Sequence, residues 1–522
     1  MTAPFELSDD SVVVIIGTGA GGGVLANELA QRGVSVVSLE AGGRYLPQDY
    51  INDEWESFGQ LAWLDPRTTS GDWRVAKDFS GLPAWIVKAV GGTTIHWAGA
   101  SLRFQPHEWK AATTYGDVPG ANLLDWPIDA DEMAPWYDLA EKKLNVTRTN
   151  GHPGLPSNNN YKVLEAGAKA LGLKEVHTGR MAINSSDNLD RMMCQQTGFC
   201  FQRCKWGAKW SAAYTDIEEG EATGNMEVRD RCQALRIEHG PDGRVNGVVY
   251  VDADGVEHKQ MARIVCVAGN SFESPRILLN SASSMFPDGM ANSSGQVGRN
   301  YMRHTTGSVY GVFDKPVKMW RGTTMAGIVQ DHAIHDPTRG FVGGFELETL
   351  SLGLPFMAAF LDPGGWGREF TSALDMYENM AGLWIVGEDM PQEENRVTLS
   401  DTKDQYGMPV ANVNFSDHEN DVAMRNFAYD LGGQIYDAVG ATRVFPTPPY
   451  PSTHNLGTNR MSDDPSKGVV DRFGRTHDVE NLYVSDGSQF TTGAAENPTL
   501  TIVALAIRQA DHIAGEMGKR AL

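Results

Sequence analysis

The chain has 522 residues, of which 41% are hydrophobic and 21% are charged, and its formal net charge is −22. The acidic balance argues against nucleic-acid binding because no basic stripe is available to neutralise phosphates. No apolar run reaches the roughly 18 residues that a membrane-spanning helix needs, and residues 1–11 carry neither the basic nor the apolar region of a secretory signal. We therefore expect a globular chain of two or more domains, with no direct membrane span and no export signal of its own.

The first elements predicted along the chain form a β–α–β unit around a glycine-rich turn. They are a buried strand (residues 11–16), the turn (17–22), a helix (23–32) and a second strand (34–39). Gly17 permits the tight turn, Gly19 lets the backbone approach a pyrophosphate, and Gly22 permits close packing of helix on strand. Glu40 ends the second strand, where it can accept hydrogen bonds from ribose hydroxyls. The unit predicts a dinucleotide site with the phosphates at the helix N-terminus.

The later elements interleave strands with helices. In chain order we predict a loop (residues 45–85), a small-residue stretch suited to a planar ring (91–99), a helix (160–172), two strands (226–251) around a turn at 240–243, a buried strand (264–270), a helix with Pro275 near its start, an antiparallel sheet (305–450), a short buried strand (482–487) and a final helix (499–517). We expect a discontinuous nucleotide domain with a substrate domain inserted into it.

Three of the five cysteines, Cys194, Cys200 and Cys204, fall within eleven residues. Structural zinc needs four ligands, and no fourth Cys or His lies nearby in the sequence. A disulfide would use two of the three and leave the last alone. Three thiolates suit a three-iron cluster, or a four-iron cluster with one other ligand. Cys232 and Cys266 stand alone and are expected to be buried as small apolar residues.

Several segments together resemble the glucose–methanol–choline (GMC) family of flavoproteins, in the right order over nearly the whole chain. They are residues 17–22 with Glu40, residues 91–97, Ala268-Gly269 with Ser274-Pro275, residues 297–300 with His304, and residues 497–501. The resemblance implies an α/β fold in which a substrate domain, built on an antiparallel sheet, is inserted into a discontinuous Rossmann-like FAD-binding domain. The FAD-binding domain would comprise residues 1–45, 86–105, 220–305 and 452–522. The substrate domain would comprise residues 46–85, 106–219 and 306–451, with an iron–sulfur segment at 194–204.

The implied cofactor is FAD. The resemblance, with the turn described above, places its contacts at Gly17, Gly19, Gly22, Glu40, Gly92, Thr93, His96, Ala268, Asp486 and Pro498. His96 has two interpretations. The stretch around it is similar both to the pyranose-oxidase branch, in which a residue near this place bonds covalently to the flavin, and to a bacterial glucose-dehydrogenase branch with noncovalent flavin. A packing or hydrogen-bonding role is the preferred one. His304 is expected to position the flavin or a nearby loop.

Two C-terminal segments carry the implied catalytic pair. His454 opens a segment matching the family pattern H-x-x-G-T-x-R-M, and Asn497 precedes Pro498. Oxidation of an alcohol by flavin requires removal of the hydroxyl proton as hydride leaves carbon, and a neutral imidazole can accept that proton near pH 7. His454 is therefore assigned as the base and Asn497 as the group that orients the hydroxyl. Asn497 could at the same time cap the final helix.

The cysteine segment is similar to that of bacterial membrane-linked sugar dehydrogenases within this family. That resemblance implies a [3Fe-4S] cluster held by Cys194, Cys200 and Cys204. A cluster accepts one electron at a time, which favours a dehydrogenase that passes electrons to a cytochrome c or quinone.

We expect a sugar or glycoside substrate, with C3 of a glucoside preferred to C1 of glucose. A small companion subunit would carry the export signal to the periplasm, and a cytoplasmic location is the alternative. Two other functions stay open, a pyranose-oxidase-like enzyme using O2 and a non-catalytic electron-transfer flavoprotein.

Overall fold

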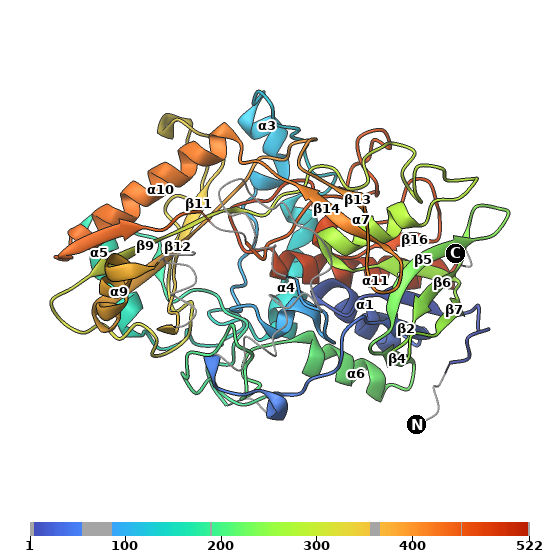
Figure 1. The fold of residues 1–522 in the computed structure, drawn as a ribbon, viewed down its shortest axis with the longest axis horizontal. Coiled ribbons are helices and arrows are strands. Elements are labelled where there is room, and N and C mark those ends of the chain that lie inside the picture. Colours follow the sequence, from blue (N-terminus) through green and yellow to red (C-terminus); the bar gives the residue numbers. More distant parts are fainter. Residues whose placement is uncertain (1–4, 55–85, 188–190, 355–365, 450–451, 520–522) are drawn as a thin grey trace.

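The structure, a computed structural model, describes residues 5–54, 86–187, 191–354, 366–449 and 452–519. Its two larger sheets lie in different halves of the molecule, a parallel sheet of five strands and an antiparallel sheet of six (Figure 1). Most of the loop predicted at 45–85 lies outside the described residues. Within the described part of the chain, no helix is both long and apolar enough to cross a bilayer.

The parallel sheet brings together strands that are far apart in the sequence. Its order is β16 (Leu482–Val484), β8 (Ile264–Val267), β1 (Val13–Ile16), β2 (Val36–Leu39) and β4 (Met226–Arg229). Every neighbouring pair in it is parallel. All residues of β1, β2, β8 and β16 are buried, which explains their continuous apolar sequences. Because the strands are parallel, the loops that follow them meet at one edge of the sheet.

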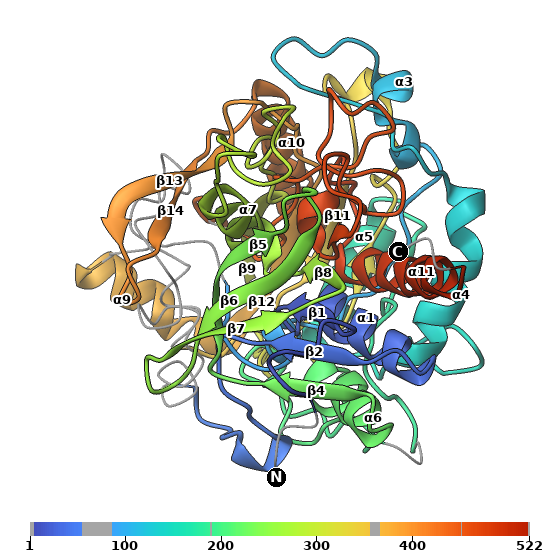
Figure 2. The same cartoon turned by 90° about the vertical axis from the view of Figure 1, so that its right-hand side faces the viewer.

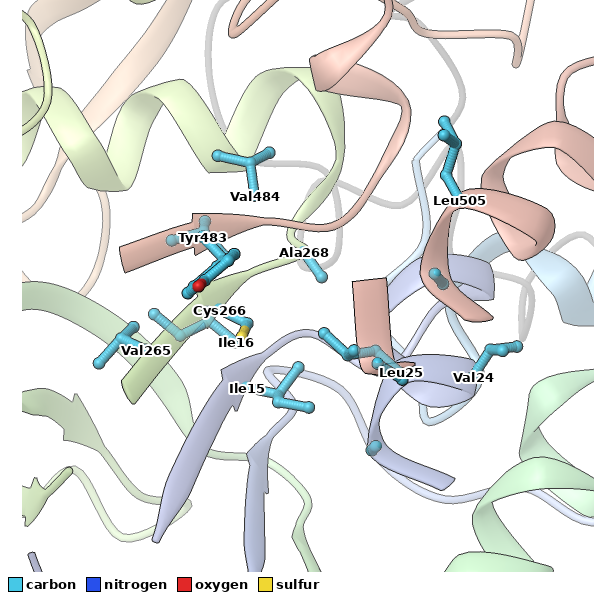
Figure 3. Packing of buried hydrophobic residues seen from close by; sticks show 14 of the residues in the cluster. Ile15, Ile16, Val24, Leu25, Val265, Cys266, Ala268, Tyr483, Val484 and Leu505 are labelled. Carbon is cyan, nitrogen blue, oxygen red and sulfur yellow. The ribbon is translucent and has the colours of Figure 1, made fainter. Parts of the chain in front are cut away.

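Helices pack around this parallel sheet. Helix α1 (Ala20–Gln31) packs against α11 (Thr499–Gly518) and α6 (Asp216–Ala222), and α11 also packs against α4 (Ala130–Leu144) (Figure 2). Figure 3 shows Val24 and Leu25 of α1 in one cluster with Cys266 of β8. Cys232 and Cys266 are both buried, as predicted from the sequence. The final helix and the first β–α–β unit are likewise confirmed.

The region after β4 differs from the prediction in two ways. Three strands replace the two predicted over residues 226–251, because β4 joins the parallel sheet and only β5 (Gln233–His239) and β6 (Val245–Val251) form the hairpin, which β7 (Glu257–Met261) extends. Pro275 is the sixth residue of α7 (Asn270–Asn280), not near its start. A proline there cannot donate to the carbonyl of Ser271, and the Thr458 hydroxyl donates to that oxygen instead, at 3.0 Å.

The antiparallel sheet predicted over 305–450 is present. Its order is β15 (Arg443–Pro446), β9 (Thr305–Val312), β12 (Met380–Gly387), β11 (Phe345–Thr349), β10 (Ile328–Val329) and β3 (Val176–His177). Helices α10 (Glu419–Asp437) and α5 (Asn159–Ala170) pack on it and on each other (Figure 1). A separate hairpin, β13 (Arg396–Lys403) with β14 (Pro409–Asn414), packs on α7. The shorter helices include α3 (Ala111–Tyr115) and α9 (Gly367–Asp375). The domain boundaries given above stay a prediction.

The tight packing of α1 on the sheet gives a testable prediction at Gly21. A Cβ on Gly21 would lie 1.7 Å from the carbonyl oxygen of Ser485. Because backbone cannot yield easily there, we expect Gly21→Ala to lower the free energy of unfolding by about 1–3 kcal/mol or more. Gly515→Ala in α11, where a Cβ would meet no atom within 4 Å, should raise it by up to about 1 kcal/mol. Urea unfolding of the two variants beside the unaltered protein measures both; equal effects would contradict the packing argument.

Candidate active site

A cavity lies where the carboxyl ends of β1, β2 and β8 meet the antiparallel sheet. It encloses about 1740 Å³ of empty space, part of it open to solvent. Residues after the parallel strands, such as Gly17, Glu40 and Ala268, line one part of it. His454 and Asn497 line another. Ligands of open parallel sheets bind at this edge, and the cavity is large enough for a dinucleotide and a small second molecule.

The glycine turn brings backbone to the cavity. Gly17 has φ +99°, and a Cβ on it would lie 2.3 Å from the carbonyl oxygen of Ala268. Gly22 lies beneath the cavity, where a Cβ would approach the Gly17 carbonyl oxygen to 2.2 Å. For Gly19 the nearest atom to such a Cβ is the Gly92 Cα, 3.9 Å away. The first two glycines therefore serve close packing, whereas Gly19 faces open space at the N-terminus of α1.

The buried Glu40 carboxylate braces this turn. Its Oε2 accepts hydrogen bonds from the Thr18 hydroxyl at 2.7 Å and the Thr18 backbone N–H at 3.1 Å, and its Oε1 accepts from the Gly42 N–H at 2.9 Å. Burial raises the pKa of Glu40, and the bonds from Gly42 and Thr18 oppose that rise. The Thr18 hydroxyl oxygen in turn accepts from the Gly91 N–H at 3.1 Å. Glu40 thus joins the turn to the stretch before Gly92 and still faces the cavity.

The other residues predicted to bind FAD also line the cavity, with Gly22 the exception. Gly92 and Thr93 belong to the short 3-10 helix η2 (Gly92–Ile95). Asp486 accepts from the Ser274 hydroxyl at 2.5 Å, the Asn270 N–H at 2.8 Å and the Ser488 N–H at 2.8 Å. Its carboxylate therefore fastens the start of α7 to the segment after β16. Pro498 caps α11, so the positive end of that helix dipole meets the cavity.

His454 is partly buried and forms a pair with a second histidine. Its Nδ1 lies 2.9 Å from the Nδ1 of His304, and the Nε2 of His304 lies 3.0 Å from the carbonyl oxygen of Gly493. Burial lowers the pKa of His454 well below its ordinary value. Burial also lowers the pKa of His304 to about 4. Both imidazoles are therefore neutral at pH 7.

Asn497, 4% exposed, lines the cavity with an Oδ1 that accepts no hydrogen bond from the described residues. Glu348 of β11 is paired in register with Trp384 of β12, so both side chains lie on the same face of the sheet. Trp384 lines the cavity, and its ring centroid lies 5.9 Å from that of His454. Burial raises the pKa of Glu348 to about 8, and Asn497 opposes that rise. The wall behind Asn497 therefore carries a neutral carboxyl at pH 7.

Cys194, Cys200 and Cys204 line one further cavity, of about 340 Å³. Burial raises the pKa of Cys194 to about 12, and the neighbouring thiols Cys200 and Cys204 add to the rise. The amide of Gln196 donates to the Cys194 sulfur at 3.3 Å. Within the described ranges, no three His, Cys, Asp or Glu side chains are placed to hold a metal ion. Three sulfurs around a cavity still suit a cluster, in which each thiolate binds a different iron.

Two contacts join the cysteine segment to the cavity wall. His96 is buried, and its Nδ1 lies 2.8 Å from the carbonyl oxygen of Phe201. The ammonium of Lys209 donates to the carbonyl oxygens of Trp97 at 2.6 Å, Cys200 at 2.8 Å and Ile95 at 3.2 Å. Burial lowers the pKa of Lys209 to about 8, against the effect of the nearby thiols. The packing or hydrogen-bonding role of His96 toward FAD stays a prediction, with covalent attachment as its alternative.

Sequence reasoning missed some residues of this site. Lys209, Glu348 and Gly21 were not singled out, and His304 was not expected to contact His454. Signals were available for two of them, since Glu346 and Glu348 alternate within an apolar strand and Lys209 follows the third cysteine by five residues. Two tryptophans that could stack on a sugar face, Trp97 and Trp384, line the cavity. Phe345 is instead buried against His332, with ring centroids 5.2 Å apart.

Comparisons with known proteins agree with the resemblance found in the motifs. Two models of the GMC oxidoreductase family match the chain, one over residues 76–306 and the other over residues 391–506. A 2-methyl-1,2-propanediol dehydrogenase of Mycolicibacterium austroafricanum is 31% identical, over 97% of this chain and 95% of its own. A paromamine 6'-oxidase of Streptomyces fradiae is 30% identical, over 98% and 93%. The fructose dehydrogenase large subunit of Gluconobacter japonicus is 29% identical, over 97% and 98%.

The fold is similar to that of a solved formate oxidase from Aspergillus oryzae, studied for the modification of its FAD. The TM-score is 0.68 at 17% identity, over 98% of this chain and 100% of that one. This likeness confirms the predicted fold class, in which a Rossmann-like region is combined with antiparallel sheets.

The hydrogen bonds to Glu40 give a testable prediction. Glu40→Gln replaces one acceptor oxygen by an NH2 group that must face the N–H of Gly42 or the donors of Thr18. Because bonds to a charged acceptor contribute about 1.5–3 kcal/mol, we expect the Kd for FAD to rise about 10- to 100-fold. Fluorescence titration of the deflavinated protein with FAD measures this change. Glu480→Gln, at a surface ion pair with Arg244, is the control, and an equal loss there would contradict the prediction.

Proposed function

Because the chain belongs to the GMC oxidoreductase family, we propose that it is an FAD-dependent dehydrogenase that oxidises a ring hydroxyl of a sugar or glycoside. C3 of a glucoside is the preferred position and C1 of glucose the second. The fructose dehydrogenase large subunit and a gluconate 2-dehydrogenase flavoprotein among the relatives support a sugar substrate. The family consists of oxidoreductases, so the non-catalytic alternative is set aside.

One observation carries the proposal: His454 and Asn497 line the same cavity as the dinucleotide turn. Bound FAD supplies a hydride acceptor, and everything else at the site is done by side chains. A neutral His454 holds a lone pair that can take the proton of the substrate hydroxyl. The free Oδ1 of Asn497 can hold a neighbouring hydroxyl in place without competing for that proton. Trp384 offers an apolar surface beside His454 for a sugar face.

We propose further that Cys194, Cys200 and Cys204 hold a [3Fe-4S] cluster, which supplies one-electron acceptance when bound. Support comes from the shared cavity, the amide donor to Cys194 and the buried cation Lys209 near Cys200 and Cys204. The charge of Lys209 opposes the rise that burial causes in the pKa of Cys200, and this favours the thiolate form that binds iron. The contacts through His96 and Lys209 hold this segment against the wall of the larger cavity, which suits transfer between the two sites.

A cytochrome c or quinone would receive the electrons outside the chain. By analogy with the large subunit of fructose dehydrogenase, we propose a small companion subunit that carries the export signal and takes the complex to the periplasm. The competing function is an oxidase that gives both electrons to O2, and the paromamine 6'-oxidase relative favours it. The peroxide formed for each substrate oxidised, compared with dye reduced without O2, separates the two.

His454→Ala should slow flavin reduction about 10²- to 10⁴-fold, because the hydroxyl proton then has no acceptor. The substrate is chosen first by scoring a panel of sugars and glycosides for anaerobic bleaching of the flavin, with the oxidised carbon assigned by NMR. Stopped-flow absorbance then compares the variant with the unaltered enzyme. His152→Ala is the control, since His152 does not line the cavity. A variant that bleaches at the original rate would refute the assignment of the base.

Cys200→Ser should remove the iron while flavin reduction by substrate stays within about twofold, because the cluster acts after hydride transfer. Electron delivery to a one-electron acceptor should then fall at least about tenfold. Iron analysis, visible absorbance and cytochrome c reduction measure these effects. Cys266→Ser, at a buried thiol that lines neither cavity, is the control. Freshly prepared enzyme with its full set of subunits and no iron would contradict the proposed cluster.

A further inference from the structure

We propose that His304 is a positioning residue that fixes the tautomer of His454, so that Nδ1 of His454 carries the proton and Nε2 presents the lone pair to the substrate. The inference rests on the proposed function, because it refines how His454 acts as the base. It follows from three hydrogen-bonding groups in a row: the Gly493 carbonyl, His304 and His454. Within this row, the hydrogen-bonding chemistry of each group fixes the tautomer of the next ring.

The first step concerns the Nε2 of His304, which lies 3.0 Å from the carbonyl oxygen of Gly493. A carbonyl oxygen accepts hydrogen bonds and never donates them. The proton of that bond must therefore sit on the Nε2 of His304. In a neutral imidazole only one nitrogen carries a proton, so the Nδ1 of His304 is then an acceptor.

The second step is that His304 is neutral. The residue is 1% exposed, and burial lowers its pKa to about 4. Its charged neighbours do not reverse this. Asp389 accepts the backbone N–H groups of Arg303 and His304, at 2.7 and 3.1 Å, and the guanidinium of Arg303 lies 3.4 Å from Asp417. The carboxylates of Asp389 and Asp417 therefore pair with backbone N–H groups and with Arg303. The ring nitrogens of His304 contact Gly493 and His454 instead.

The third step places the proton between the two rings. The Nδ1 atoms of His304 and His454 lie 2.9 Å apart, which requires one proton between them. His304 has none to give at Nδ1, so His454 donates. The neutral His454 is consequently protonated on Nδ1, and its Nε2 keeps the lone pair. After His454 takes the substrate proton on Nε2, it still donates to His304, which stabilises the imidazolium.

The backbone of His304 supports a dedicated role. Its φ is +64°, a left-handed conformation that few residues other than glycine and asparagine adopt. Such conformations persist where surrounding contacts enforce them, and they concentrate at functional sites. Here Asp389 holds the two successive backbone N–H groups before β9 begins. This arrangement directs the imidazole toward His454.

Two substitutions separate positioning from simple packing. His304→Asn tolerates positive φ and offers an oxygen that can accept from the Nδ1 of His454, whereas His304→Ala removes the acceptor. We expect the rate of anaerobic flavin reduction to fall about 10- to 100-fold in His304→Ala and less than about fivefold in His304→Asn. Because the Nδ1 of His304 accepts from His454 and so stabilises its imidazolium, the acid limb of the rate profile should move to lower pH in His304→Ala, which has no acceptor, and stay in place in His304→Asn. Packing alone would not move that limb.

Neutron diffraction from a deuterated crystal of the FAD-loaded enzyme tests the tautomer without relying on activity. A deuteron on Nδ1 of His454 is expected, and one on Nε2 alone would overturn the inference. An unchanged rate in His304→Ala, or equal losses in both variants with full FAD content, would also overturn it. If His304→Ala fails to fold, the position of the deuteron on His454 decides. A deuteron on Nδ1 together with an active His454→Ala would instead refute the proposed base and leave the tautomer standing.

Discussion

Backbone contact between the first glycine turn and the ends of β8 and β16 is the constraint on which the whole site depends. Gly17 and Gly21 approach the carbonyl oxygens of Ala268 and Ser485 so closely that a single added carbon would collide with them. These contacts bring together the ends of three strands from distant parts of the sequence. The floor of the cavity is therefore made of main chain, whose N–H groups and helix dipole can meet a phosphate. The side chains that would act on substrate come from elsewhere.

The second half of the site is held by a buried cation. Lys209 donates to the carbonyl oxygens of Ile95 at the end of η2, of Trp97 just after it and of Cys200 in the cysteine segment. Burying an ammonium group is costly unless its protons are satisfied, and here all three find carbonyl acceptors. If the cysteine segment moved away from the cavity wall, the buried ammonium group of Lys209 would lose the Cys200 carbonyl as an acceptor. This explains how residues 194–204, which form neither helix nor strand, can be kept in a fixed position beside the larger cavity.

The sequence predicted what depends on local pattern and missed what depends on tertiary contact. Continuous apolar runs identified β1, β2, β8 and β16, because strands buried on both faces need them. The turn at 240–243 fixed the β5–β6 hairpin, but β4 could not be separated from it, since β4 pairs with a strand nearly 200 residues earlier. Pro275 was misplaced because the hydroxyl of Thr458, far along the chain, satisfies the carbonyl that it frees.

The same division holds for the candidate site. The predicted residues His454, Asn497 and Glu40 are brought to one cavity, as family motifs implied. The contact between His304 and His454 joins residues 150 positions apart, and no spacing rule reaches that far. Glu348 faces the cavity side of its sheet because its register partner is Trp384, which only strand pairing reveals. Motifs therefore located the residues proposed to react, whereas the groups that tune them required the fold.

His454 and the two groups that tune the site, His304 and Glu348, share one property, which is neutrality at pH 7. His304 and His454 have lowered pKa values and Glu348 a raised one, and burial is the main cause of each shift. A low-dielectric, uncharged site makes a weak resting base, which at first appears unsuited to alcohol oxidation. Proton and hydride leave the same alcohol, however, so positive charge at His454 arises as negative charge reaches the cofactor. Opposite charges formed close together in such surroundings attract strongly. The apolar site therefore disfavours transfer of the proton alone or of the hydride alone, and it favours transfer of both together.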